Sequence, residues 1–190
     1  MGVHKGARGI GIIAVVLLSV IASPAQVAAQ APEEFEGVLA STAAGASGLA
    51  QIRIQIEEYT TDAETREFVS ILANEGWEAL ENRFIREEKG RFIRQGQLGH
   101  DIAFARSIPH ETGRIIRLAT ARPIVFAEAY NSTRSRDYAF GIIELRLDEE
   151  GKGSGIVIAA AKVEFNDEGE LEIESYGNPP FSITTIEVRD

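Results

Sequence analysis

The 190-residue chain contains no cysteine and only one methionine and one tryptophan. Without cysteine it can form neither a disulfide framework nor a cysteine-ligated zinc or iron–sulfur site. The sequence also lacks the Gly-x-Ser-x-Gly elbow and any Ser-x-x-Lys pair, which leaves nucleophilic serine catalysis without support. Residues 151–155 (GKGSG) match a phosphate loop only in part, because the upstream glycine is missing. We therefore expect no cofactor and no catalytic residues of these familiar kinds.

The first 29 residues have the pattern of a cleaved export signal. Lys5 and Arg8 precede an uncharged apolar run over residues 10–21, and small residues follow up to Ala29. The run is too short for a membrane-spanning helix, which needs about 20 apolar residues. We expect cleavage after Ala29 and a periplasmic or extracellular product that spans no membrane. Residues 30–190 then form one domain, since the length and the 44% hydrophobic content suit a single core.

Acidic residues outnumber basic ones, and the formal net charge is -10. Removing the two leader cations leaves 17 Lys and Arg against 29 Asp and Glu, a net charge of -12 for the mature chain. This balance argues against nucleic acid as a partner. Residues 83–136 nevertheless carry 11 cations and 5 acids. This basic middle segment is expected either to pair with acidic neighbours across a sheet or to form an anion-binding face.

Hydrophobic periodicity predicts strands near both ends of the domain and a helical pair between them. A strand is expected over residues 35–41, and Ile52, Ile54 and Ile56 alternate with polar residues as in a second, half-buried strand. Thr61 and Glu64 form a capping box that starts a helix, and Gly76 ends it. A second short helix follows from Trp77, whose helical spacing with Leu80 and Phe84 favours a core position over a ligand platform.

Nearly everything after residue 90 alternates as strand and turn. Strands are expected around residues 102–104, 114–122, 138–147, 155–165, 171–174 and 182–188. Short connections between them favour antiparallel pairing. The predicted fold class is α+β: a large curved antiparallel β-sheet with one helical pair packed against it. The sequence leaves an open sheet, a sandwich and a barrel undecided.

Paired alanines on several strands have two interpretations. Ala103 and Ala105 are predicted to share a face, as are Ala119 and Ala121. Such small side chains let a helix approach a sheet closely, and they also leave room for a ligand inside a curved sheet.

The densest basic cluster lies at the end of the second helix and the start of the next strand. It comprises Arg83, Arg86, Lys89, Arg91 and Arg94. Cations at a helix C-terminus favour the helix dipole, which explains some of them. The alternative hypothesis is an anion-binding site built from Arg83, Arg86, Arg91 and Arg94.

Four further residues are candidates for a binding or acid–base role. His100 and Asp101 are adjacent and could form a histidine–carboxylate base. Arg106 alternates with Ile102 and Phe104, and Glu128 falls on the face of apolar neighbours. Charges on a core face must be paired or functional, whereas on the opposite face they would be solvated. His100 and His110 are too far apart along a strand for a joint metal site, so no metal site is predicted.

These observations favour an exported, non-catalytic domain that binds a small molecule or a partner protein. A structural or assembly subunit is the first alternative. A small hydrolase or isomerase with a His-Asp or carboxylate base is the second.

Overall fold

The computed structural model describes residues 31–41, 48–124, 137–165, 171–175 and 181–189. In chain order the elements are β1 (Glu33–Ser41), β2 (Gly48–Ile56), α1 (Asp62–Glu75), α2 (Trp77–Phe84), β3 (Gly90–Arg94), β4 (His100–His110), β5 (Gly113–Thr120), β6 (Phe140–Asp148), β7 (Lys152–Phe165), β8 (Leu171–Ser175) and β9 (Phe181–Arg189). The predicted signal segment and Glu128 lie outside the described residues. The predicted α+β class, with antiparallel strands and one helical pair, is confirmed.

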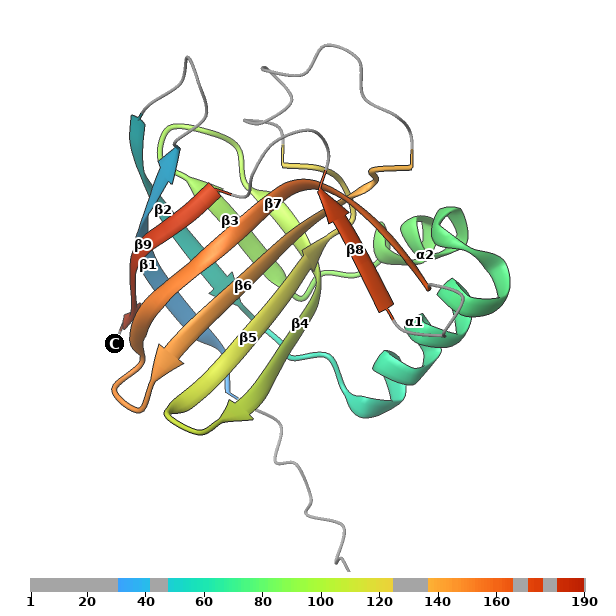
Figure 1. Ribbon diagram of the computed structural model, residues 1–190, viewed down its shortest axis with the longest axis horizontal. Coiled ribbons are helices and arrows are strands. Elements are labelled where there is room, and N and C mark those ends of the chain that lie inside the picture. Colours follow the sequence, from blue (N-terminus) through green and yellow to red (C-terminus); the bar gives the residue numbers. More distant parts are fainter. Residues whose placement is uncertain (1–30, 42–47, 125–136, 166–170, 176–180, 190) are drawn as a thin grey trace, which may run out of the picture.

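The sheet closes into an eight-stranded antiparallel barrel (Figure 1). Strands β1 to β7 follow one another, except that the helical pair lies between β2 and β3. Strand β9 inserts between β7 and β1, and the pairing of β6 with β7 completes the closure. Strand β8 pairs with the last part of β7 outside the ring. The end that holds the start of β1 and the β6–β7 turn is called the lower end below, and the opposite end the upper end.

Alternating side chains fill the barrel interior. In β2, Ile52, Ile54 and Ile56 point inward and are at most 3% exposed, so the predicted alternation is confirmed. Large apolar side chains of the other strands complete one cluster, among them Phe35, Phe92, Ile116, Leu118, Ile143, Leu145 and Ile183. An eight-stranded barrel is just wide enough for side chains to fill it. In the described part of the chain the interior is therefore a packed core.

The helical pair covers one outer wall of the barrel. The Thr61–Glu64 capping box and the end at Gly76, with φ of 86°, are confirmed. Phe68 of α1 and Phe84 of α2 meet edge to face, with ring centroids 5.1 Å apart. These helices pack on outward-facing residues of the barrel strands, including Ala103, Ala119, Phe140 and Val163. Trp77 is half-buried against the same cluster, as predicted for a core residue. The small side chains at positions 103 and 119 thus serve helix packing.

A bulge in β4 breaks the predicted alternation. The pairing with β5 shifts between Ile102 and Phe104, so Ala103 and Phe104 both face the helices while Ile102 and Ala105 face the interior. The prediction that Ala103 and Ala105 share a face was therefore wrong. The extra residue changes the face of every side chain that follows it.

A short β3 leaves the lower half of β4 without a full neighbouring strand. Only Gly90, Arg91 and Phe92 of β3 pair with β4. Lower down, Thr60 takes the place of a strand residue. Its N–H donates to the Ala105 carbonyl at 2.7 Å, and its hydroxyl accepts from the Ala105 N–H at 3.0 Å. The segment that leaves β2 therefore seals the barrel wall before α1 begins.

Tyr59, next to Thr60, closes the lower end of the barrel. Its hydroxyl donates to Glu33, and Arg114 holds the same carboxylate with two hydrogen bonds of 2.7 and 3.0 Å. Burial, reinforced by this carboxylate, raises the pKa of Tyr59 well above its ordinary value. The tyrosine is therefore neutral. Together with Glu33 and Arg114 it forms a hydrogen-bonded polar cluster that covers the lower end of the core.

Candidate functional site

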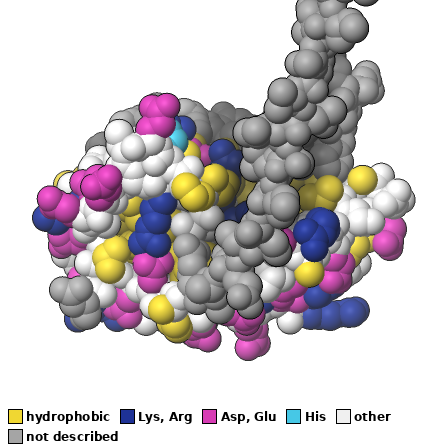
Figure 2. All heavy atoms as spheres, turned by 90° about the horizontal axis from the view of Figure 1, so that it is seen from below, with side chains coloured by type: hydrophobic (Ala, Val, Ile, Leu, Met, Phe, Trp, Pro, Cys, Tyr) yellow, Lys and Arg dark blue, Asp and Glu magenta, His cyan; other side chains and the backbone are white. Residues whose placement is uncertain are grey.

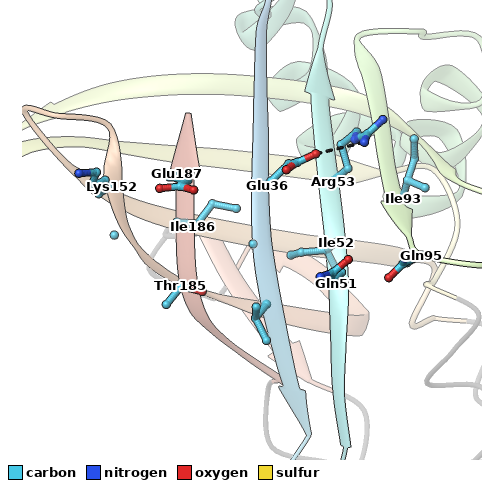
Figure 3. Close-up of a pocket in the computed structure, with 13 residues that line it drawn as sticks. Glu36, Gln51, Ile52, Arg53, Ile93, Gln95, Lys152, Thr185, Ile186 and Glu187 are labelled. Atoms are coloured by element: carbon cyan, nitrogen blue, oxygen red, sulfur yellow. Dashed lines mark hydrogen bonds and ion pairs between the residues drawn. The ribbon is translucent and has the colours of Figure 1, made fainter. Parts of the chain in front are cut away.

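A hollow of about 740 Å³, open to solvent, lies on the outer wall formed by β3, β2, β1 and β9 and by the start of β7 (Figure 3). We call it the outer groove. It lies on the side of the barrel opposite the helical pair (Figure 1). Its outward-pointing lining residues are Glu36, Val38, Gln51, Arg53, Ile93, Gln95, Lys152, Thr185 and Glu187. Strand register arranges these residues in two rows that run across the strands.

The first row is charged. In register it runs from Lys152 through Glu187 and Glu36 to Arg53. Arg53 lies 3.1 Å from Glu36, and Arg189 on the neighbouring strand lies 2.6 Å from the same carboxylate. Glu36 is thus held between two guanidinium groups (its pair with Arg53 is drawn in Figure 3). The two charge-assisted hydrogen bonds hold this carboxylate in place.

The second row is neutral. Thr185 lies opposite Val38, Val38 lies opposite Gln51, and the Gln95 N–H donates to the Gln51 carbonyl at 2.9 Å. The side chains of Gln51, Gln95 and Thr185 are exposed. Each glutamine offers both donors and acceptors, and threonine offers a hydroxyl.

The groove continues to the lower end of the barrel. A second hollow of about 680 Å³ shares Glu36, Lys152 and Glu187 with it and extends past the β6–β7 turn to Arg114. Figure 2 looks onto this end and shows basic and acidic side chains next to one another, with acidic ones along the rim. The lining of this second hollow is mostly charged, and two of its cations are engaged with carboxylates: Arg114 with Glu33, and Lys152, at 3.6 Å, with Glu150.

The structure separates the members of the predicted anion site. Arg83 in α2 pairs with Glu67 and Glu87, and Arg86 follows that helix in an exposed position. Arg91 points outward from β3, 3.2 Å from Asp101, whereas Arg94 lies opposite inward-facing Ile52. Within the described part of the basic middle segment, Arg91 and Arg117 pair with acidic residues of adjacent strands, as one of the two interpretations predicted. The four arginines do not converge on one point.

Lys89, the fifth member of the basic cluster, is a buried structural residue. Its side chain is 5% exposed, and its amino group lies 2.7 Å from Glu64 and 3.3 Å from Glu58. Burial alone would lower the pKa of Lys89, but the hydrogen bonds to these carboxylates outweigh burial and raise it. Burial likewise opposes ionisation of Glu64, yet Lys89 and the Thr61 cap lower the pKa of Glu64 to about 2. Lys89 directly precedes β3, and its carbonyl accepts a hydrogen bond from the Glu57 N–H directly after β2. The ion pair with Glu64 therefore attaches α1 to the place where β2 and β3 adjoin.

The predicted His–Asp pair is divided between the two faces of β4. His100 lies opposite the buried Phe92, and Asp101 lies opposite the exposed Arg91. Neighbours on a strand point to opposite faces, so the two side chains are not arranged as a catalytic pair. Burial lowers the pKa of His100, although the nearby Asp101 charge acts in the opposite direction.

Arg106 is a paired charge on the helix-facing side of the barrel. It donates to Asp62 at 2.6 Å and to Thr65 at 3.0 Å, both in the first turn of α1. Of the two interpretations considered for this residue, pairing is the one observed. Over the described residues, no three His, Asp or Glu side chains gather closely enough to hold a metal ion.

The outer groove contains none of the seven candidate residues of the sequence analysis that the structure describes. Alternation in β2 does show that Gln51 and Arg53 lie on a polar face. Which other polar faces adjoin it depends on the pairing of β1 with β9 and of β9 with β7, which links residues far apart in the sequence. No local signal reports that arrangement.

Comparisons with protein-family models, with curated proteins and with solved structures find no match to this chain. Within the described residues, neither helix has the length and apolar character needed to cross a membrane.

Proposed function

We propose that the protein is an exported, non-catalytic binding domain that holds a polypeptide segment of a partner in the outer groove. The observation that carries this proposal is the groove itself, a hollow of about 740 Å³ lined by exposed amide, hydroxyl and charged side chains from five neighbouring strands. The scaffold beneath it is a closed barrel with a packed core, which presents these side chains on a rigid wall.

The character of the groove favours a macromolecular partner over a small ligand. Small-molecule sites are concave, largely apolar, and enclose most of the ligand surface. The outer groove does not enclose a ligand: it is open to solvent, and its charged and amide side chains stand beside the outward-facing apolar side chains of Val38 and Ile93. An open surface of mixed polar and apolar character resembles a protein–protein interface, which is about as apolar as the rest of a protein surface.

Recognition in the groove has to use side chains. A peptide can add as a strand only where a sheet edge is free. Strands β9, β1 and β2 each pair on both sides, so their backbone groups are already engaged. The donors and acceptors of Gln51, Gln95 and Thr185 are the groups in the neutral row that can bind a peptide backbone.

The test is selection of peptides from a displayed random hexapeptide library on the protein purified after export. Thr185→Trp fills the neutral row with a bulky side chain. Asn82→Trp is the control, because it places the same side chain at an exposed position of α2, on the other side of the barrel. We expect selected peptides to bind Thr185→Trp at least about tenfold more weakly and to bind Asn82→Trp within about twofold of the parent.

Two results would overturn the proposal. One is that no peptide is enriched over an unrelated control protein. The other is that the two tryptophan variants bind every selected peptide equally well, provided both unfold at the temperature of the parent protein. The exported state is tested in the same preparation, because cleavage after Ala29 leaves a mature chain that begins at Gln30.

A further inference from the structure

We infer that the groove selects a basic segment and that Glu187 is the residue that pairs with its lysine or arginine side chain. This inference rests on the proposed function, because it names the class of ligand that the same groove takes. It follows from the charges of the groove, the register of its strands and its length.

Among the residues that the structure describes, Glu187 is an acidic side chain with no cation in ion-pair contact. It lies on the outer face of β9, exposed, directly between Lys152 and Glu36 in register. Glu36 is already held by Arg53 and Arg189. The described part of the chain provides no ion pair for Glu187, since the Lys152 amino group lies near Glu150 instead.

The register places Glu187 between a like and an opposite charge. Glu36 lies directly opposite it on β1, and Lys152 lies directly opposite it on β7. Arg53 and Arg189 already hold the Glu36 carboxylate, and the Lys152 amino group lies near Glu150. A ligand with a basic side chain therefore gains an ion pair with Glu187 that no described cation of the groove makes.

The surrounding surface has an excess of the same charge. The outer groove and the adjoining lower hollow are together lined by six acidic residues, Glu33, Glu36, Asp148, Glu149, Glu150 and Glu187. Four cations, Arg53, Arg114, Lys152 and Arg189, also line them. The whole chain has a formal charge of -10, which adds long-range attraction for a basic partner.

The position of Glu187 also predicts where the basic residue lies in the bound segment. The groove crosses five neighbouring strands, β3, β2, β1, β9 and β7, and four inter-strand spacings of about 4.8 Å give a length of roughly 19 Å. An extended chain covers that length with about six residues. Glu187 lies near the β7 end, whereas Gln51 and Gln95 lie toward the β3 end. The basic side chain therefore belongs near one end of a hexapeptide, with small polar residues toward the other.

The experiment selects from the displayed random hexapeptide library in parallel on the parent protein, on Glu187→Gln and on Glu78→Gln. Glu78 is an exposed acid in α2, so its variant makes the same charge change away from the groove. We expect the parent and Glu78→Gln to enrich lysine or arginine at one near-terminal position. We expect Glu187→Gln to select peptides without that preference.

The affinity of one enriched peptide then provides the quantitative readout. At physiological salt we expect Glu187→Gln to weaken it about three- to tenfold and Glu78→Gln to leave it within about twofold. The difference is expected to shrink in 1 M NaCl because salt screens an exposed pair. Enrichment of basic residues that survives in Glu187→Gln, equal weakening by both variants, or selection without any basic preference would each overturn the inference. Failure of the parent to select any peptide would overturn the proposed function itself.

Discussion

The ion pair of Lys89 with Glu64 makes the strongest stability prediction. Replacing Lys89 by methionine keeps the length and apolar stem of the side chain but removes the cation. Glu64 and Glu87, whose side chains are 25% and 13% exposed, then lose the buried partner at 2.7 and 3.8 Å, and Glu58 at 3.3 Å loses it as well. The variant is expected to be strongly destabilised, since a partly buried carboxylate left without its cation is poorly solvated.

The magnitude follows from how much water reaches these carboxylates. Removing one partner of a fully buried pair costs about 3–5 kcal/mol, and the partial exposure of Glu64 and Glu58 reduces this to about 2–4 kcal/mol. In a domain of this size that corresponds to a melting temperature lower by roughly 5–15 °C. Lys152→Met is the matched control. Its side chain is 60% exposed with one ion pair at 3.6 Å, so its cost is expected to stay below about 0.5 kcal/mol.

The pH dependence separates the ion pair from simple packing. The folded-state pKa of Glu64 is about 2, below its ordinary value of 4.5, so the pair stabilises the fold above pH 4.5. That contribution is lost as the pH falls from about 5 toward 2. Urea unfolding followed by Trp77 fluorescence and circular dichroism measures the free energy of unfolding of both proteins. A difference under about 1 kcal/mol at pH 7, or one that stays constant from pH 5 to pH 2, would refute the reasoning.

Three further predictions concern the segment between β2 and α1, the first residue of β3 and the lower end of the barrel. Thr60→Val leaves the buried Ala105 N–H without its side-chain acceptor, so we expect a loss of about 1–3 kcal/mol and faster hydrogen exchange at that amide. The parent protein is expected to lose stability above pH 10, where unfolded tyrosine ionises but folded Tyr59, with its raised pKa, does not; Tyr59→Phe should lack that dependence in alkaline unfolding titrations. Gly90→Ala is expected to destabilise by several kcal/mol in thermal unfolding, because its φ of 148° suits glycine and a Cβ there would collide with the backbone of β2.

Local signals in the sequence predicted most of the secondary structure. The capping box at Thr61 and the glycine at position 76 marked the first helix because each acts on its own turn of backbone. The alternation of Ile52, Ile54 and Ile56 marked β2 for the same local reason. Closure into a barrel could not be predicted this way. It depends on β9 pairing with both β1 and β7, contacts that join opposite ends of the chain.

The candidate site could not be predicted from the sequence for a related reason. His100 and Asp101 are adjacent in sequence, but a strand places adjacent side chains on opposite faces. The bulge at Ala103 then changed the faces of the residues that follow. Conversely, Glu187 and Glu36 lie side by side only because β9 returns to pair with β1. Groups that meet across strands leave no trace in sequence spacing.

The two sides of the barrel differ in how far their outward-facing side chains are covered. On the helix side, Lys89 and Arg106 hold α1 to the barrel, and the apolar faces of both helices are buried. On the opposite wall no described helix covers the strands, and the side chains of the neutral row stay exposed. Glu187 lies on that wall beside Glu36, a like-charged neighbour. Lys152 lies directly opposite Glu187 on its other side, so the two neighbouring charges offset each other and Glu187→Gln is expected to change the free energy of unfolding by less than about 0.5 kcal/mol. A variant that keeps its stability while losing basic peptides would identify Glu187 as a residue whose carboxylate serves binding.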